Sequence, residues 1–298
     1  MSAMSGQPLG TAPRVAVVVG SGSVKCAAAI GLWRVLQRAG IGVDLLVGCS
    51  GGAVFAGLLA LGHAPDEAES IARHCFTRDA TSRRDRGALW RAVLPRVFGF
   101  GERWGLRDDR PLLAALRRAF GDRTFADART PLLVTATDFH TGAQVVLSDG
   151  PLVDAVRASV AIPFAFAPWP SGGRLLVDGF LSDPLPVGVA VREGAHVIIA
   201  MGFESPYQPA VRSVGRFAFQ VSSIMTNNLL RASFAFHGSV HHGEVIPIIP
   251  RFTRRVGLFD TAMIPYVVEE GERAAEEQLP YLQRLLGTRA ECDAMAWP

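Results

Sequence analysis

A serine flanked by glycines stands between a strand-like segment and a helix-forming segment of small residues. The sequence Gly48-Cys49-Ser50-Gly51-Gly52 follows the apolar run 43–47 and precedes residues 52–61. A G-x-S-x-G sequence in this context is typical of a nucleophile elbow, a sharp turn that exposes a hydroxyl above the carboxyl edge of a sheet. We therefore interpret Ser50 as a nucleophile for acyl transfer, with a glycine-rich turn of no chemical role as the alternative.

A second glycine-rich segment, Gly20-Ser21-Gly22-Ser23-Val24-Lys25, also lies between an expected strand and an expected helix. Its glycines would let backbone N–H groups converge on an anion. Nucleotide binding is disfavoured, because Lys25 stands where G-x-G-x-x-G has its third glycine and because the P-loop spacing is absent. An oxyanion hole beside Ser50 is the favoured interpretation, and a purely structural turn is the third.

An aspartate at the end of a short apolar run is the candidate base. Asp178-Gly179 follows residues 175–177, although such a pair is by itself often only a turn. A histidine base stays open, since His237, His241 and His242 are among the histidines that follow the aspartate, as the histidine does in α/β-hydrolases. The adjacent histidine pair has no carboxylate cluster beside it, so no metal site and no cofactor are predicted.

The expected elements place these segments at one edge of a sheet. Buried apolar runs alternate with amphipathic stretches, which predicts a three-layer α/β/α fold with a mainly parallel central sheet. We expect a disordered tail over residues 1–13 and one domain over 14–298, with an arginine-rich helical insertion at about 64–129 and a C-terminal helical portion at about 203–298. The predicted strands are 14–19, 43–47, 131–137, 143–147, 175–177, 196–201 and 246–249, and the predicted helices are 24–39, 52–61, 151–159, 212–236 and 265–286.

Taken together and in this order, the three segments resemble the patatin-like phospholipases. The family's oxyanion loop is similar to Gly20–Lys25 with Ile30–Trp33 after it, its elbow to Gly48–Gly52, and its Ser-Asp dyad motif to Asp178-Gly179. Further similar stretches are Thr137-Asp138, Thr141-Gly142, Asp154–Ser159 and Ala161–Pro163, so the resemblance covers about residues 14–202.

The resemblance implies a patatin-like fold and a Ser50–Asp178 dyad that cleaves fatty-acyl esters of phospholipids, lysophospholipids or other lipids. Burial would raise the pKa of the aspartate toward a value useful for a base. The oxyanion hole would comprise Gly20, Gly22, Ser23, Val24 and Lys25, with the lysine positioning the loop. An acyltransferase or thioesterase on the same site and a non-catalytic lipid-binding scaffold are the alternatives.

The chain departs from the family pattern at three positions. Ser23 and Cys26 stand where the oxyanion loop usually has glycine, and Asp183 stands where an asparagine is common. Cys26 would place a side chain beside the oxyanion loop, and Ser23 would have to adopt dihedral angles that let its N–H donate. These two departures keep the non-catalytic scaffold among the alternatives.

Composition limits the partners of the chain. Hydrophobic residues make up 49% of the 298 residues and the formal net charge is +3, which is too small to suggest nucleic acid. No apolar run reaches the roughly 20 residues of a membrane span, so we expect a cytoplasmic protein. The lipid or acyl-ester substrate is what the resemblance implies. Arginines interleaved with Trp90 and Trp104 over residues 83–118 predict contact with a membrane surface, with a solvated helical face as the alternative.

Overall fold

The computed structural model describes residues 13–75, 83, 85, 87–205, 207, 210–240 and 243–294. The predicted disordered tail, residues 1–13, lies outside the described residues except for Pro13, and so do His241 and His242. The predicted domain boundaries stay a prediction.

The strands form a single sheet. They are β1 (Val15–Val19), β2 (Leu45–Cys49), β3 (Leu132–Asp138), β4 (Gln144–Leu147), β5 (Trp169–Ser171), β6 (Arg174–Asp178), β7 (Val197–Met201) and β8 (Glu244–Ile248). Their order is β5-β6-β3-β2-β1-β7-β8, with β4 also paired to β3. The pairs β2–β3, β1–β2, β1–β7 and β7–β8 are parallel, whereas β4, β5 and β6 pair antiparallel. The central strands are apolar and buried along their whole length, as expected of parallel strands covered on both faces.

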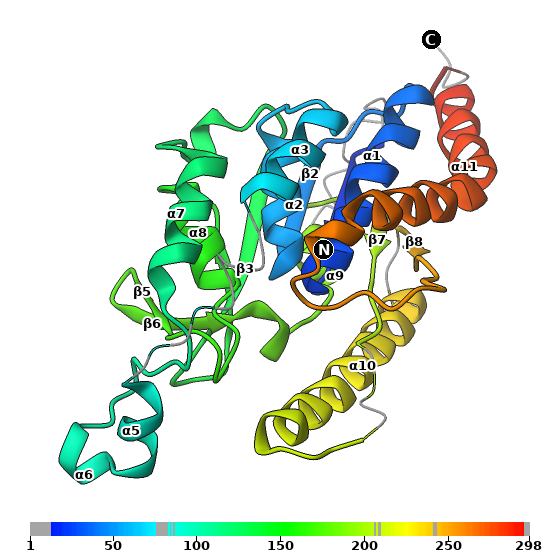
Figure 1. The fold of residues 1–298 in the computed structure, drawn as a ribbon. Coiled ribbons are helices and arrows are strands. Elements are labelled where there is room, and N and C mark those ends of the chain that lie inside the picture. The colour runs from blue at the N-terminus through cyan, green and yellow to red at the C-terminus, as the bar shows by residue number, and fades with distance from the viewer. Residues whose placement is uncertain are drawn as a thin grey trace, which may run out of the picture.

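Helices cover both faces of the sheet (Figure 1). They are α1 (Ala28–Arg38), α2 (Gly51–Ala60), α3 (Pro65–Cys75), α5 (Ala88–Val93), α6 (Pro95–Phe98), α7 (Asp109–Phe120), α8 (Leu152–Ser159), α9 (Val187–Arg192), α10 (Val214–Val240) and α11 (Ile264–Ala294), with short 3-10 helices η1 (Ser23–Ala27), η2 (Phe125–Asp127), η3 (Gly179–Leu181) and η4 (Thr261–Met263). One core joins the sheet to α1, α2, α3, α7, α8 and α11. A second core joins its other face to α9 and α10. The predicted three-layer α/β/α fold with a mainly parallel sheet is confirmed.

Several elements differ from the sequence-based expectation. The short elements β5 and α9 were not predicted, because three residues that include Pro170 and six residues after Pro186 carry too little periodicity to read. The last helix continues through Pro280 to Ala294, beyond the predicted end at residue 286. Within the arginine-rich segment, α3 and α7 contribute to the core, while α5 and α6 stand away from the rest of the fold (Figure 1).

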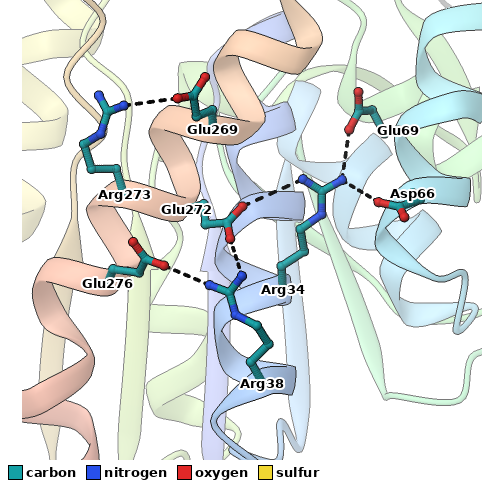
Figure 2. A network of polar contacts seen from close by, with 8 residues as sticks. All are labelled: Arg34, Arg38, Asp66, Glu69, Glu269, Glu272, Arg273 and Glu276. Atoms are coloured by element: carbon teal, nitrogen blue, oxygen red, sulfur yellow. Dashed lines mark hydrogen bonds and ion pairs between the residues drawn. The ribbon is translucent and has the colours of Figure 1, made fainter.

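The C-terminal helix is held tightly against the first helix. A Cβ atom at Gly31 of α1 would collide with the carbonyl oxygen of Val268, and one at Gly271 of α11 would collide with that of Ala28. The absence of side chains therefore lets the two backbones touch. On the exposed side, arginines of α1 bridge the acidic residues of α3 and α11 (Figure 2), with the pairs Arg34–Asp66, Arg34–Glu69, Arg34–Glu272, Arg38–Glu272 and Arg38–Glu276. This packing fixes α1, whose start carries the first glycine-rich loop.

Candidate active site

Ser50 occupies a sharp turn between β2 and α2. Its backbone has φ 55° and ψ −126°, a left-handed region that costs a residue with a side chain roughly 1–2 kcal/mol. The turn is close-packed, since a Cβ atom at Gly48 would lie 2.5 Å from the Cα of Ala53. Glycine at this position therefore permits the elbow. The backbone of Ser50 is thus strained, and its hydroxyl lies at the start of α2, where the peptide dipoles favour a developing negative charge.

Asp178 is the direct partner of the Ser50 hydroxyl. The Ser50 Oγ donates to Asp178 Oδ2 at 2.7 Å, and the other carboxylate oxygen accepts from the Phe180 N–H at 3.1 Å. Asp178 is the last residue of β6, which runs antiparallel to β3. The chain must turn there in contact with β3, because a Cβ atom at Gly179 would lie 2.6 Å from the carbonyl oxygen of Thr135. The Asp-Gly pair thus aims the carboxylate at the elbow.

Burial determines the acidity of this aspartate. Asp178 is fully buried, and desolvation raises its pKa from 3.8 to about 7, against the opposing effects of the Ser50 hydroxyl, the Phe180 N–H and the Arg157 charge. A carboxylate with this pKa accepts a proton efficiently near neutral pH.

Two residues of α8 support the dyad and were not assigned a role from sequence. The Ser159 Oγ accepts from the Ser50 N–H at 2.8 Å and donates to the Thr135 carbonyl at 2.7 Å, which links the elbow to β3. Arg157 is fully buried, pairs with Asp109 at 2.7 Å, and donates to the Ala167 carbonyl. Both residues lie in the similar stretch Asp154–Ser159, but a sequence motif alone does not show which atoms they contact.

The first glycine-rich loop lies directly against the elbow. A Cβ atom at Gly51 would lie 2.5 Å from the Ser23 carbonyl oxygen and 2.8 Å from its nitrogen. Ser23 itself has φ 54°, so it adopts the left-handed conformation for which the family usually has glycine. The Ser23 hydroxyl donates to the Leu258 carbonyl, which ties the loop to the segment before α11.

Three of the five residues assigned to the oxyanion hole have amides that are already engaged. The N–H of Gly20 donates to Met201, that of Val24 to Leu258 and that of Lys25 to Gly22. For the amides of Gly22 and Ser23, no acceptor is found among the described residues. The Val24 N–H, one of the three expected oxyanion donors, is thus occupied in this structure, and Gly22 and Ser23 stay the candidate donors.

Lys25 anchors the loop at a distance from the serine. Its Nζ donates to the Glu204 carbonyl at 2.8 Å and lies 5.5 Å from the centre of the Phe252 ring. Burial lowers the pKa of Lys25. The lysine thus joins the loop to the segments that follow β7 and β8, and the positioning role that the resemblance implies stays a prediction.

The other departures from the family pattern are accommodated in the packing. The buried Cys26 Sγ donates to the Gly20 carbonyl at 3.2 Å, and burial raises the pKa of this thiol well above its ordinary value. Asp183 accepts from the Leu185 N–H at 3.1 Å, and burial raises its pKa to about 6. Cys26 is therefore a neutral thiol, and it lines neither of the two cavities at Ser50.

Two cavities of different character meet at Ser50 and Ser23. The narrow cavity, of about 70 Å³, is lined mainly by apolar side chains, among them Val54, Phe55, Ala72, Leu112, Leu116 and Phe166. The wide cleft, of about 990 Å³, contains four cationic and two acidic side chains, namely Lys25, Arg107, Arg216, Arg255, Glu204 and Asp260. The serine therefore lies where an apolar cavity and a polar, mainly cationic cleft join.

The described histidines have partners away from the serine. His63, His74, His140 and His196 interact with Glu67, Ser70, Glu102 and the Arg14 N–H respectively, and none of them lines the two cavities. Of the candidates for a histidine base, His237 belongs to α10, and His241 and His242 lie outside the described residues. Within the described part of the chain, no group of three or more histidine, cysteine or acidic residues is arranged to hold a metal ion.

Comparison with known proteins identifies the family. The model of the patatin-like phospholipase family matches residues 17–191, more than half of the chain, and includes all three motifs. The chain belongs to the patatin-like phospholipase family, a class of lipid acyl hydrolases, and the predicted resemblance is confirmed.

Curated relatives match about two thirds of this chain. An uncharacterised NTE family protein of Mycobacterium tuberculosis is 33% identical over 191 residues, which cover 64% of this chain and 49% of that protein. Patatin-like phospholipase domain-containing protein 7 of Rattus norvegicus is 29% identical over 64% of this chain and 14% of its own length. The chain thus spans about half the length, or less, of these relatives.

Among solved structures, the crystal structure of VipD from Legionella pneumophila matches 91% of this chain and 67% of its own chain, with a TM-score of 0.48 and 13% identity. Among the described helices, none has the length and apolar character that crossing a membrane requires.

Proposed function

We propose that this chain hydrolyses a fatty-acyl ester bond of a phospholipid or lysophospholipid, with Ser50 as nucleophile and Asp178 as its base. The 2.7 Å hydrogen bond from the Ser50 hydroxyl to the buried Asp178 carboxylate carries the proposal. Support comes from the pKa of about 7 that burial gives this carboxyl group and from the family to which the chain belongs.

The reaction would proceed through an acyl-enzyme. The Ser50 Oγ attacks the acyl carbonyl carbon while its proton passes to Asp178 Oδ2. The tetrahedral intermediate then breaks its bond to the leaving alcohol, which takes that proton and departs, and the acyl group stays on Ser50. Water attacks this ester next and gives its proton to Asp178. The bond to Ser50 breaks, the serine regains a proton, and the fatty acid leaves.

The negative oxygen of each intermediate would be stabilised by the loop against the elbow. The amides of Gly22 and Ser23 are unoccupied within the described part of the loop, and the Ser23 backbone touches Gly51. Loss of one such donor typically raises the barrier by about 3 kcal/mol. Proline, the one residue without a backbone N–H, cannot adopt the φ of 54° at Ser23, so Ser23→Gly, which keeps the N–H, is the substitution that probes the conformation of the loop.

The two cavities support a substrate with one apolar and one anionic part. The acyl chain would occupy the narrow cavity between α2, α3 and α7. The glycerol and headgroup would occupy the wide cleft, where four cationic side chains exceed two acidic ones. Arginine suits phosphate because its planar fork donates two parallel hydrogen bonds. A phosphate-bearing ester is therefore favoured over a neutral lipid.

The two alternatives differ in how well the site supports them. The scaffold was motivated by Cys26, yet this side chain is buried with its thiol on the Gly20 carbonyl and leaves Ser50 accessible from two cavities. An acyltransferase would use the same dyad with another acceptor in place of water. The cytoplasmic location and the contact with a membrane surface that the sequence suggests stay predictions.

Labelling with a fluorophosphonate probe tests the proposal. The probe should attach to Ser50, mapped by mass spectrometry of the modified peptide, and Ser50→Ala should lose the label. Cys26→Ser is the matched control, since it changes the buried thiol beside the loop and should keep the label. Attachment at any other residue, or no attachment to the folded protein, would contradict the assignment.

A further inference from the structure

The long helix α10 exposes an apolar face. Phe217, Val221, Ile224, Met225 and Leu229 are spaced so that they share one side of the helix, and they are 38–61% exposed. We call these five residues the apolar stripe. Contiguous exposed apolar surface of this kind is uncommon on proteins that remain monomeric in water, and it marks sites of contact with a partner or a membrane.

The stripe is a fixed part of the fold. On the opposite side of α10, Leu230 is buried in the second core. The Asn227 side chain accepts from the Ser205 N–H at 2.8 Å and donates to the Ser205 carbonyl at 3.0 Å, and the Ser233 hydroxyl donates to the Leu185 carbonyl. Because the inner side is anchored in this way, the outer side is held outward as a surface.

The charges of α10 indicate what this surface contacts. The helix has no aspartate or glutamate over 27 residues, whereas an exposed helix in water usually carries charges of both signs. Its two arginines, Arg216 and Arg231, are exposed. The helix itself thus has two arginines and no acidic residue, while Glu204 of the segment before it pairs with Arg231 at 3.3 Å. A helix with an exposed apolar face and only cationic charges of its own suits an anionic lipid surface, into which apolar side chains insert while arginines contact phosphates.

The same helix forms a wall of the catalytic cleft. Phe219, Ser222, Ser223 and Thr226 line the wide cleft that reaches Ser50. Ser222 is three residues before Met225 and seven before Leu229, so it adjoins the edge of the stripe on the helix surface. A lipid under the stripe would thus lie next to the cleft entrance.

We propose that α10 docks the protein on an anionic phospholipid bilayer through the apolar stripe, so that a lipid passes from the bilayer along this helix to Ser50. The proposal rests on the proposed function in one respect, namely that the substrate is a membrane lipid. Docking itself does not require the chemical step, and the two can be measured apart.

Vesicle binding by the inactive variant Ser50→Ala tests the docking. We expect the Ser50→Ala protein to sediment with vesicles of phosphatidylcholine and phosphatidylglycerol, and to bind less to vesicles of phosphatidylcholine alone. Adding Val221→Gln, Ile224→Gln and Met225→Gln should weaken binding at least about tenfold, because each apolar side chain loses its favourable transfer into lipid. All three positions are exposed, so the fold should persist, and circular dichroism checks this.

Two controls make the surface specific. Val146→Gln on β4 is the same change as Val221→Gln at nearly the same exposure, 38% against 41%, and should leave binding unchanged. Val93→Gln with Val97→Gln alters the exposed apolar residues of α5 and α6, the segment for which the sequence predicted membrane contact. Loss of binding in this pair, with full binding in the stripe variant, would overturn the proposal.

Turnover separates failure of docking from failure of the proposed function. With Ser50 intact, the stripe variant should hydrolyse a soluble short-chain ester at the wild-type rate and vesicle lipid at least about tenfold more slowly. If the wild type cleaves the soluble ester but Ser50→Ala does not bind vesicles, docking is wrong and the function stands. If vesicles are bound through the stripe but no ester is cleaved, docking stands and the proposed function is wrong. A stripe variant that turns a dimer into a monomer while vesicle binding stays intact would identify a second copy of the chain as the occupant.

Discussion

Replacing the buried base by its amide should inactivate the protein and also stabilise it. In the folded chain the pKa of Asp178 is raised from 3.8 to about 7, so above pH 7 the fold holds a desolvated carboxylate that is better solvated when unfolded. This shift corresponds to roughly 4 kcal/mol of lost stability at high pH. In Asp178→Asn, the amide oxygen can still accept from the Phe180 N–H, and its nitrogen can donate to the Ser50 hydroxyl.

The stabilisation by Asp178→Asn should grow as pH rises. The folded carboxyl group keeps its proton up to about pH 7, whereas the unfolded one loses it near 3.8, so the stability of the wild type falls as pH rises through this window. The free energy of unfolding of Asp178→Asn relative to wild type should therefore increase by about 2–3 kcal/mol from pH 5 to pH 8. Urea denaturation followed by circular dichroism at both pH values measures it.

A second aspartate provides the control. The N–H groups of Thr141 and His140 lower the pKa of Asp138, so its contribution to stability is lost only at pH values below its ordinary pKa. The effect of Asp138→Asn should accordingly be the same at pH 5 and pH 8. If Asp178→Asn destabilises the protein at pH 8, or if its effect does not change between the two values, then Asp178 is not a desolvated carboxylate and our account of the base is wrong.

Three further substitutions test the surroundings of the dyad. Ser159→Ala removes the acceptor of the Ser50 N–H and the donor to a buried carbonyl. It should lower both the free energy of unfolding, by about 1–3 kcal/mol, and kcat. Unchanged values in denaturation and ester assays would show that Ser159 does not connect the elbow to β3. Ser23→Gly should relieve roughly 1 kcal/mol of left-handed strain and keep ester turnover at least at the wild-type level, which severe loss would contradict. Ala72→Leu should fill the narrow cavity and reduce kcat/KM for long-chain but not acetyl esters, and an equal effect on both would place the acyl chain elsewhere.

The sequence was sufficient for the features that are local. Two local patterns could be recognised in the sequence. The apolar runs of β1, β2 and β7 predicted the alternation of strand and helix, and the glycines around Ser50 predicted the elbow. The resemblance added Asp178, which lies 128 positions after Ser50 in the sequence.

The features that the sequence could not supply depend on contacts between residues far apart in the chain. The Val24 amide is taken by the carbonyl of Leu258, and no pattern near Val24 signals this. The same holds for Ser159, whose role arises because α8 brings it against both the elbow and β3. Side chains that act by contact across the fold can be assigned only when the fold is known.

Fatty-acid release from phosphatidylglycerol dispersed in detergent tests the central claim most directly, since it follows cleavage of the acyl ester bond itself and since the variants compared leave the apolar stripe unchanged. The account predicts that the wild type releases fatty acid, that Ser50→Ala and Asp178→Asn each reduce kcat by roughly 10³-fold or more, and that His237→Ala retains most of the activity. A histidine variant as inactive as Ser50→Ala, or an Asp178→Asn variant that keeps wild-type turnover, would contradict the Ser50–Asp178 dyad.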